Sequence, residues 1–380
     1  MLTALRRKAE ERVRDLSPSA FSELAVAPQG VSLPSIEGAL LPECRGAHIV
    51  FVDGHFSRSL SVLPRGLVCL PLEAAALSYG LFLQARFAKS IAEETDPLAL
   101  LNSARFSGGA FLYVPAGMAF TEPVQVLHVL TGSGLALPRL HVSLGEGASL
   151  ALVETLQGSG ACNGLVDVAL GARSQLQWVS VQMGAETDLL NTTLMATVKS
   201  EANLKVLHAT TGGRLFARVH LLEEQAFALL QGLAMLTHTR QANLHTLVEH
   251  VAPSCTSRQH IKSVLQGASK SHFEGKILVR PAAQKTESYQ LNNNLLLGEQ
   301  AVAKSLPNLE IFADDVKASH GATFAELGET ELFYLRSRGL SSPEAKLLLT
   351  DGFCRELIDE VRIDSVRVQL LEAMHGLHTA

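Results

Sequence analysis

The residue best suited to chemistry is His320, which lies in a small, polar segment between Asp314 and Thr323. A neutral imidazole can bind iron or zinc, and Gly321 beside it would let the backbone of a partner approach closely. Asp314 and Asp315 could orient the ring. The spacing alone favours a loop histidine that hydrogen-bonds to Asp315, with a metal ligand as the alternative.

A single histidine cannot hold an iron–sulfur cluster, which normally takes four ligands, mostly thiolates. The chain has five cysteines, none of them in a C-x-x-C pattern: Cys44, Cys69, Cys162, Cys255 and Cys354. An odd, scattered set is typical of reduced thiols in a cytoplasmic protein rather than of a disulfide framework. If His320 is a metal ligand, the other ligands must come from another chain, and we expect the isolated chain to hold no cofactor tightly.

The chain has 14 histidines, which raises the question of a second metal site. His245, Glu249 and His250 fall on one predicted strand, where His245 and Glu249 share a face and His250 points away. That geometry makes a poor chelate, so we expect polar residues on an exposed strand face. Five further histidines are each alone on predicted strands and are expected to be satisfied surface or rim residues: His128, His141, His208, His220 and His238.

Several common functions lack their signatures. The segment Gly267–Ser271 has a lysine beside a serine but not the glycine spacing of a phosphate-binding loop, so the chain is not expected to hydrolyse ATP. The G-x-S-x-G and H-E-x-x-H motifs of common hydrolases are missing. The net charge is −5 with no basic run, which argues against nucleic acid. The richest apolar stretch, 66–88, contains Pro71, Glu73 and Arg86, so no membrane span is expected.

A strand is predicted just before His320 and a helix after it. Leu309, Ile311 and Ala313 alternate with polar residues, while a helical pattern containing Leu332 and Leu335 ends at Gly339, a typical C′ glycine. Four residues near the end of this helix could anchor a partner: Phe333, Tyr334, Arg336 and Arg338. They could equally be solvated, and the two interpretations have about equal weight.

Residues 1–105 are expected to be a mixed α/β region. A charged helix is predicted over 3–15, with Ser17-Pro18 ending it or starting another. A loop follows over 28–46, then a strand over 47–52, the Asp53-Gly54 turn and a second strand over 59–62. The pattern from about 73 to 94 predicts one helix.

Residues 106–327 are expected to be β-structure. A polar turn followed by a small residue recurs along them, but at uneven spacing, at Ala148, Ser174, Ala202, Ala226, Ala242 and Ala268. This pattern suits a β-helix, whose inward residues stack coil on coil, and equally a β-sandwich with irregular loops. Asn292-Asn293-Asn294 could form an asparagine ladder in a β-helix.

Residues 328–380 are expected to be helical. Ser341 and Glu344 form a potential capping box, or Ser342 caps with Pro343 as the first helical residue, and the helix should run to Gly352. A last helix should start near Asp364. These helices carry too few apolar positions to stand alone, so we expect them to pack on the core and offer their remaining face to a partner.

Two segments carry a family resemblance: A-D-D-V-K-A-S-H-G-A-T over 313–323 and L-F-Y-L-R-S-R-G-L over 332–340. They closely resemble the SufB/SufD family of the SUF iron–sulfur cluster assembly machinery. Gly321 follows the histidine where SufB has an acidic residue, which favours the SufD branch over a SufB-like scaffold. Two features depart from the family: Ala318 replaces a frequent cysteine, and the usual W-K-Y-T-like segment is missing near the N-terminus.

The resemblance implies a right-handed parallel β-helix core with a C-terminal helical domain. It implies a non-catalytic subunit that pairs with SufB through the β-helix, binds the SufC ATPase through its helical tail and is linked indirectly to a cysteine desulfurase. His320 matches a histidine implicated at the SufB interface, where a transient iron–sulfur cluster would form. The chain could self-associate without SufB. The competing classes are a β-helix carbohydrate enzyme, for which no paired carboxylates stand out, and a purely structural assembly protein.

Overall fold

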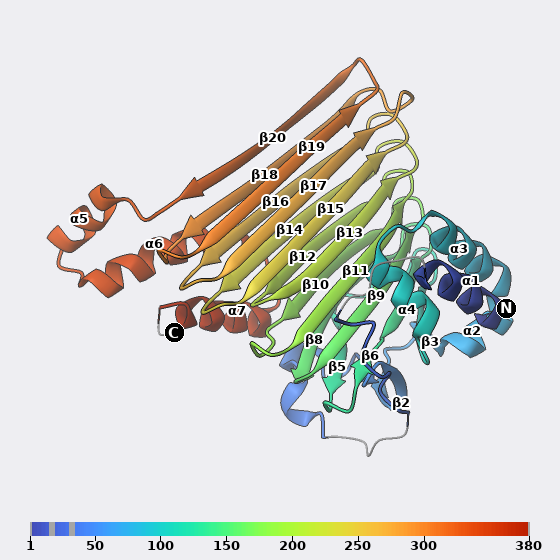
Figure 1. Ribbon diagram of the computed structural model, residues 1–380. Helices are drawn as coiled ribbons and strands as arrows, with labels where there is room; N and C mark the ends of the chain where they lie inside the picture. Colours follow the sequence, from blue (N-terminus) through green and yellow to red (C-terminus); the bar gives the residue numbers. More distant parts are fainter. Residues whose placement is uncertain (1, 15–19, 30–34, 379–380) are drawn as a thin grey trace.

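The computed structural model describes residues 2–14, 20–29 and 35–378, and its centre is a β-solenoid of two sheets (Figure 1). The first sheet holds β1 (His48–Val52), β2 (His55–Val62), β5 (Val124–Leu130), β8 (Ser149–Gly158), β10 (Gln175–Gln182), β12 (Asn203–Thr210), β14 (Phe227–Leu236), β16 (Thr256–Leu265), β18 (Thr286–Leu296) and β20 (Val316–Ala325). The second holds β3 (Val68–Pro71), β4 (Ala110–Val114), β6 (Leu135–Ala136), β7 (Arg139–Leu144), β9 (Ala161–Leu170), β11 (Leu189–Val198), β13 (Gly213–Leu221), β15 (Gln241–His250), β17 (Lys270–Val279) and β19 (Val302–Ile311).

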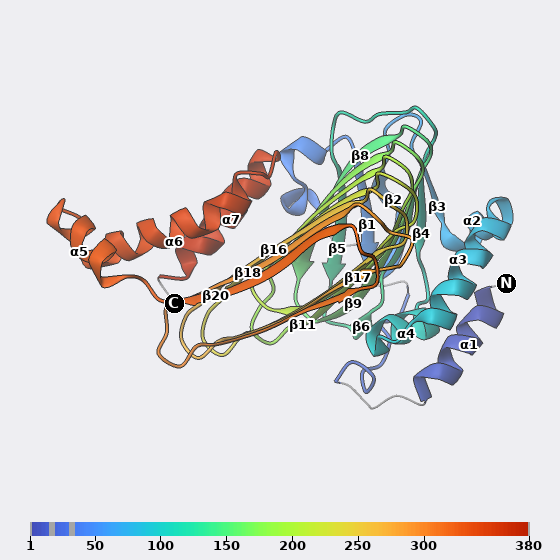
Figure 2. The same cartoon turned by 90° about the horizontal axis from the view of Figure 1, so that it is seen from above.

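The chain alternates between the two sheets, so each strand from β8 to β20 lies parallel to the strand of the next coil (Figure 2). This arrangement confirms the β-helix and excludes the sandwich. Aliphatic side chains fill the space between the sheets, which we call the bore. The end of the solenoid at β19 and β20, which we call the open end, leaves both of these strands as sheet edges.

The recurring small residues mark two different corners of the solenoid. At the corner that leads into the first sheet, a residue with positive φ precedes a small buried one, as in Arg173 (φ 58°) before Ser174 and Glu201 (φ 56°) before Ala202. Ala242 and Ala268 instead lie where the chain enters the second sheet, which explains the uneven spacing. Cys255, which the pattern of small residues did not single out, continues the first series after Ser254 (φ 59°).

The N-terminal region contains α1 (Leu2–Arg14), α2 (Leu72–Ser78), α3 (Gly80–Glu93) and α4 (Pro97–Arg105). The first helix is confirmed, whereas the helix predicted over 73–94 is broken at Tyr79 (φ −119°, ψ 23°). α4 was missed, although Asp96 caps it by accepting the Ala99 amide at 2.9 Å. Ser17-Pro18 lies outside the described residues. The 28–46 loop contains the 3₁₀ turns η1 (Glu37–Ala39) and η2 (Pro42–Cys44).

The Asp53-Gly54 hairpin is confirmed, with φ of 48° and 86°. Its second strand is longer than predicted because it starts at His55. The hairpin also joins the solenoid, since β1 pairs in parallel with β5. The division of the chain at residues 105 and 327 stays a prediction.

Three helices follow the solenoid: α5 (Glu329–Ser337), α6 (Ser342–Ile358) and α7 (Asp364–Gly376). The capping box of Ser341 and Glu344 is confirmed. The predicted end of α6 at Gly352 is wrong, because Leu357 and Ile358 extend an apolar face that is buried and outweighs a glycine cost of about 1 kcal/mol.

Both α6 and α7 pack on the outer face of the first sheet, with α5 projecting away from it (Figure 1). Leu357, Val366 and Leu370 of the helices belong to one buried apolar cluster with Val181 and Leu207 of the sheet. No helix of the described residues is both long enough and apolar enough to cross a membrane.

Candidate functional site at the open end

His320 lies on β20, the last strand, and not in a loop as expected. The segment became a strand because ten of its residues pair in parallel with β18, which supplies the backbone partners that a lone polar segment lacks. Its side chain is exposed, and no described residue hydrogen-bonds to the imidazole. The expected bond to Asp315 is therefore wrong: the Asp315 amide donates to Gln284 Oε1 at 2.9 Å, in the preceding coil.

The neighbours of His320 show which face of β20 it occupies. Lys317 pairs with Glu287 at 2.9 Å, and Asn293 donates to Thr323 at 2.8 Å, both on the outer face of the sheet. Because side chains alternate along a strand, His320 faces the bore. It is exposed because no further coil covers this end.

The described residues do not form a resident metal centre. They contain no group of three or more histidine, cysteine, aspartate or glutamate side chains that could hold a metal ion. All five cysteines are buried and unpaired. Burial raises the pKa of Cys44, Cys69 and Cys354 to about 12, which disfavours the thiolate that binds metal. If a cluster forms at His320, most of its ligands must come from another chain.

The exposed strand face expected on β15 is wrong, because Glu249 and His250 are buried and His245 is half-buried. His245 Nδ1 lies 3.3 Å from Glu274, whereas Glu249 lies 2.6 Å from His220 Nδ1 and 2.5 Å from Arg280. His250 faces the bore, with its Nε2 2.8 Å from Ser257 Oγ. Each group therefore has a separate partner.

Three histidines that were expected at the surface are buried instead: His128, His141 and His208. His128 Nε2 lies 2.7 Å from Glu154, and His208 Nδ1 lies 3.2 Å from Ser180. His238 lies in a turn, with φ of 53°. The alternation of apolar and polar residues could not predict this burial, because both faces of these strands are covered and residues on either face can be buried.

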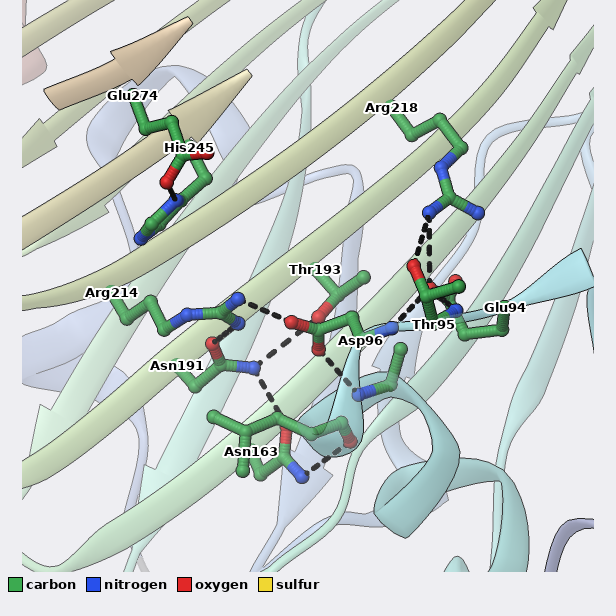
Figure 3. Close-up of polar contacts among 12 residues, drawn as sticks. Glu94, Thr95, Asp96, Asn163, Asn191, Thr193, Arg214, Arg218, His245 and Glu274 are labelled. Atoms are coloured by element: carbon green, nitrogen blue, oxygen red, sulfur yellow. Dashed lines mark hydrogen bonds and ion pairs between the residues drawn. The ribbon is translucent and has the colours of Figure 1, made fainter. Parts of the chain in front are cut away.

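A polar network holds the N-terminal helices on the outer face of the second sheet (Figure 3). Arg214 pairs with Asp96, Arg218 lies 3.2 Å from Glu94, and Asn191 donates to Asn163 at 2.8 Å. This asparagine stack lies between neighbouring coils. The predicted ladder over 292–294 is wrong: Asn292 and Asn294 face the bore, but no asparagine of the neighbouring coils lies in register with them. The charges in this network are paired, so we interpret it as structural.

The residues predicted to anchor a partner form an exposed surface on α5. Phe333 is 72% exposed and Tyr334 55%, and Arg336, Arg338 and Gly339 are also exposed. The Arg338 guanidinium lies 5.2 Å from the centre of the Tyr334 ring. An apolar groove of about 410 Å³ runs between α5 and α6, lined by Tyr334, Leu335, Leu348 and Leu349.

Comparison with known proteins places the chain in a family. The domain described as "SUF system FeS cluster assembly, SufBD core domain" matches residues 128–353, and the SufBD N-terminal region matches 41–126. A SufBD family protein of Synechocystis is 26% identical over 97% of this chain and 86% of its own length. The cluster assembly protein SufD of Escherichia coli is 36% identical over 39% of this chain and 35% of its own length. A SufBD family protein of Mycobacterium leprae is 33% identical over 47% of this chain and 48% of its own length. The chain therefore belongs to the SufBD family of the SUF iron–sulfur cluster assembly system.

Proposed function

We propose that the chain is a SufD-type, non-catalytic scaffold subunit that pairs with SufB through the open end of its solenoid. The observation that carries this proposal is the unpaired edge of β20, which presents His320. Free strand edges bind a second chain through backbone hydrogen bonds. Phe324 on β20 is 54% exposed and Phe312 just before it is 60% exposed, and such apolar side chains suit a protein interface.

The cluster would be cargo at this interface rather than a resident cofactor. His320 offers one imidazole ligand, and the buried cysteines of this chain cannot supply the others. SufB would therefore contribute thiolates. Ala318, which replaces a frequent family cysteine, faces the bore on the same strand. Alanine has no donor atom, so His320 would be the ligand that this strand supplies.

Because this chain lacks a phosphate-binding loop, ATP hydrolysis would be left to the SufC ATPase. The C-terminal helices would bind SufC. α6 and α7 are held on the sheet, and α5 keeps Phe333 and Tyr334 free for a partner. The five unpaired thiols suit a reducing compartment, so we place the chain in the cytoplasm.

The test is co-expression with SufB and SufC, anaerobic purification, and analysis of iron and sulfide. His320→Ala should leave the complex intact but lower its cluster content. Ser319→Ala, on the outer face, should leave both the complex and its cluster content unchanged. Unchanged cluster content in His320→Ala would show a purely structural role. A cluster built and kept by this chain alone, or ATP hydrolysis without SufC, would contradict the proposal.

A further inference from the structure

The bore changes from apolar to polar as it approaches the open end. One inward column runs in register through Trp178, Val206 and Leu230 and continues through Gln259 and Gln290. The next residue in this column is His320. Buried amides are costly unless they are hydrogen-bonded, so two successive glutamines at this place require an explanation.

The amide of Gln290 is satisfied on one side only. Its Nε2 donates to Gln259 Oε1 at 3.1 Å, and Thr246 donates to the same oxygen. The Gln290 side chain is 3% exposed, yet its Oε1 has no hydrogen-bond partner among the described residues. Because Nε2 is turned back to the preceding coil, Oε1 is left on the side of β20.

Gly275 on β17 makes room for this amide. A Cβ at position 275 would lie 2.2 Å from Gln290 Nε2 and 2.4 Å from Phe273 Cζ. A glycine inside a strand often marks such a close approach. The second sheet therefore has the shape needed to keep Gln290 in its present place.

His320 has the complementary deficit. A neutral imidazole carries one N–H donor and one nitrogen lone pair, and the ring has no partner among the described residues. Neighbouring strands are about 4.8 Å apart, so a rotation of the exposed ring brings one nitrogen within reach of Gln290 Oε1. Each group then satisfies the other.

We propose that Gln290 is a positioning residue that fixes the tautomer of His320. Gln290 Oε1 accepts the ring N–H, and the other nitrogen keeps its lone pair and is directed out of the open end. Metal-binding histidines are commonly oriented by an acceptor at their second nitrogen. The direction toward a cluster rests on the proposed function, whereas the fixed tautomer does not.

The experiment is long-range proton–nitrogen NMR of the full chain, labelled with ¹⁵N-histidine, at about pH 8, above the usual histidine pKa of about 6.5. The His320 signals are identified by their loss in His320→Ala. The native chain should show one tautomer, and Gln290→Leu should show a mixture of two. Gly275→Ala, which pushes on both Phe273 and the amide without removing the amide, should have the same effect and decides the matter if Gln290→Leu does not fold.

Two further variants complete the test. Ser288→Ala removes an inward hydroxyl whose neighbour on β20 is Ala318, so it should keep the single tautomer. Gln290→Glu keeps an acceptor, so His320 should again show a single tautomer. Gln259 can turn its unpartnered Nε2 toward the new carboxylate. Equal tautomer ratios in the native chain and Gln290→Leu would overturn the inference. Unchanged cluster content in His320→Ala would instead remove the proposed role of His320 at the cluster, in favour of a purely structural one, and leave the tautomer result intact.

Discussion

The Nδ1 atom of His141 on β7 lies 3.0 Å from Oδ2 of Asp167 on β9, in the neighbouring coil. Arg139 Nε donates to His141 Nε2 at 3.1 Å, so this nitrogen carries no proton and the ring is neutral. Burial lowers the pKa of His141, which Asp167 offsets only in part. Burial raises the pKa of Asp167, but Arg86 and His141 together outweigh it and hold the pKa well below its usual range.

Asp167→Asn should destabilise the fold by about 3 kcal/mol, because it leaves the half-buried Arg86 charge without its counterion. Urea unfolding measures this change. Glu287→Gln, which removes an exposed ion pair with Lys317, is the matched control and should have little effect, since exposed pairs contribute little. Equal losses in the two variants would show that burial does not determine the contribution.

Stability should fall as the pH is lowered from about 6.5 to about 4. Burial lowers the pKa of His208 and of His250 to about 4 in the folded chain. The unfolded state then binds protons that the folded state does not, at a cost on the order of 1.4 kcal/mol for each pKa unit. Urea unfolding across this range measures the slope. His208→Asn, which can keep the bond to Ser180, should make the slope shallower, and an unchanged slope would contradict this assignment.

Phe324→Glu should weaken binding to SufB without unfolding the chain. It places a charge in an exposed apolar position beside the free edge, where loss of an anchor costs about 2 kcal/mol, or about 30-fold in Kd. Isothermal titration with SufB measures the affinity. Val368→Glu on α7, a position of similar exposure, should bind normally. Equal affinity for Phe324→Glu and the native chain would move the SufB interface away from the open end.

The double variant Phe333→Ser, Tyr334→Ser should lower SufC affinity at least about tenfold. Both side chains are exposed on α5, so the fold should be unaffected. Deleting residues 328–380 should abolish capture too, but it also uncovers Val181 and Leu207 on the sheet, so point variants separate binding from folding. Leu81→Ser on α3, which is also exposed, is the control. A pull-down in which the double variant captures SufC normally would exclude α5 as the binding surface.

Local features of this protein could be predicted from the sequence because they depend on residues a few positions apart. The Asp53-Gly54 hairpin, the Ser341–Glu344 capping box and the C′ glycine at 339 are all of this kind. The family motifs around His320 and Arg336 are also continuous segments, so they were visible in the sequence.

The tertiary structure decided which groups meet. Gln290 and His320 become neighbours only because two coils stack in register, and Arg214 pairs with Asp96, which lies 118 positions earlier in the sequence. The inward or outward direction of each histidine was also decided there. In a solenoid both faces of a strand can be covered, so alternation of apolar residues no longer distinguishes them. The open end is also a product of the stacking of coils: β20 is an edge because no further coil stacks on it.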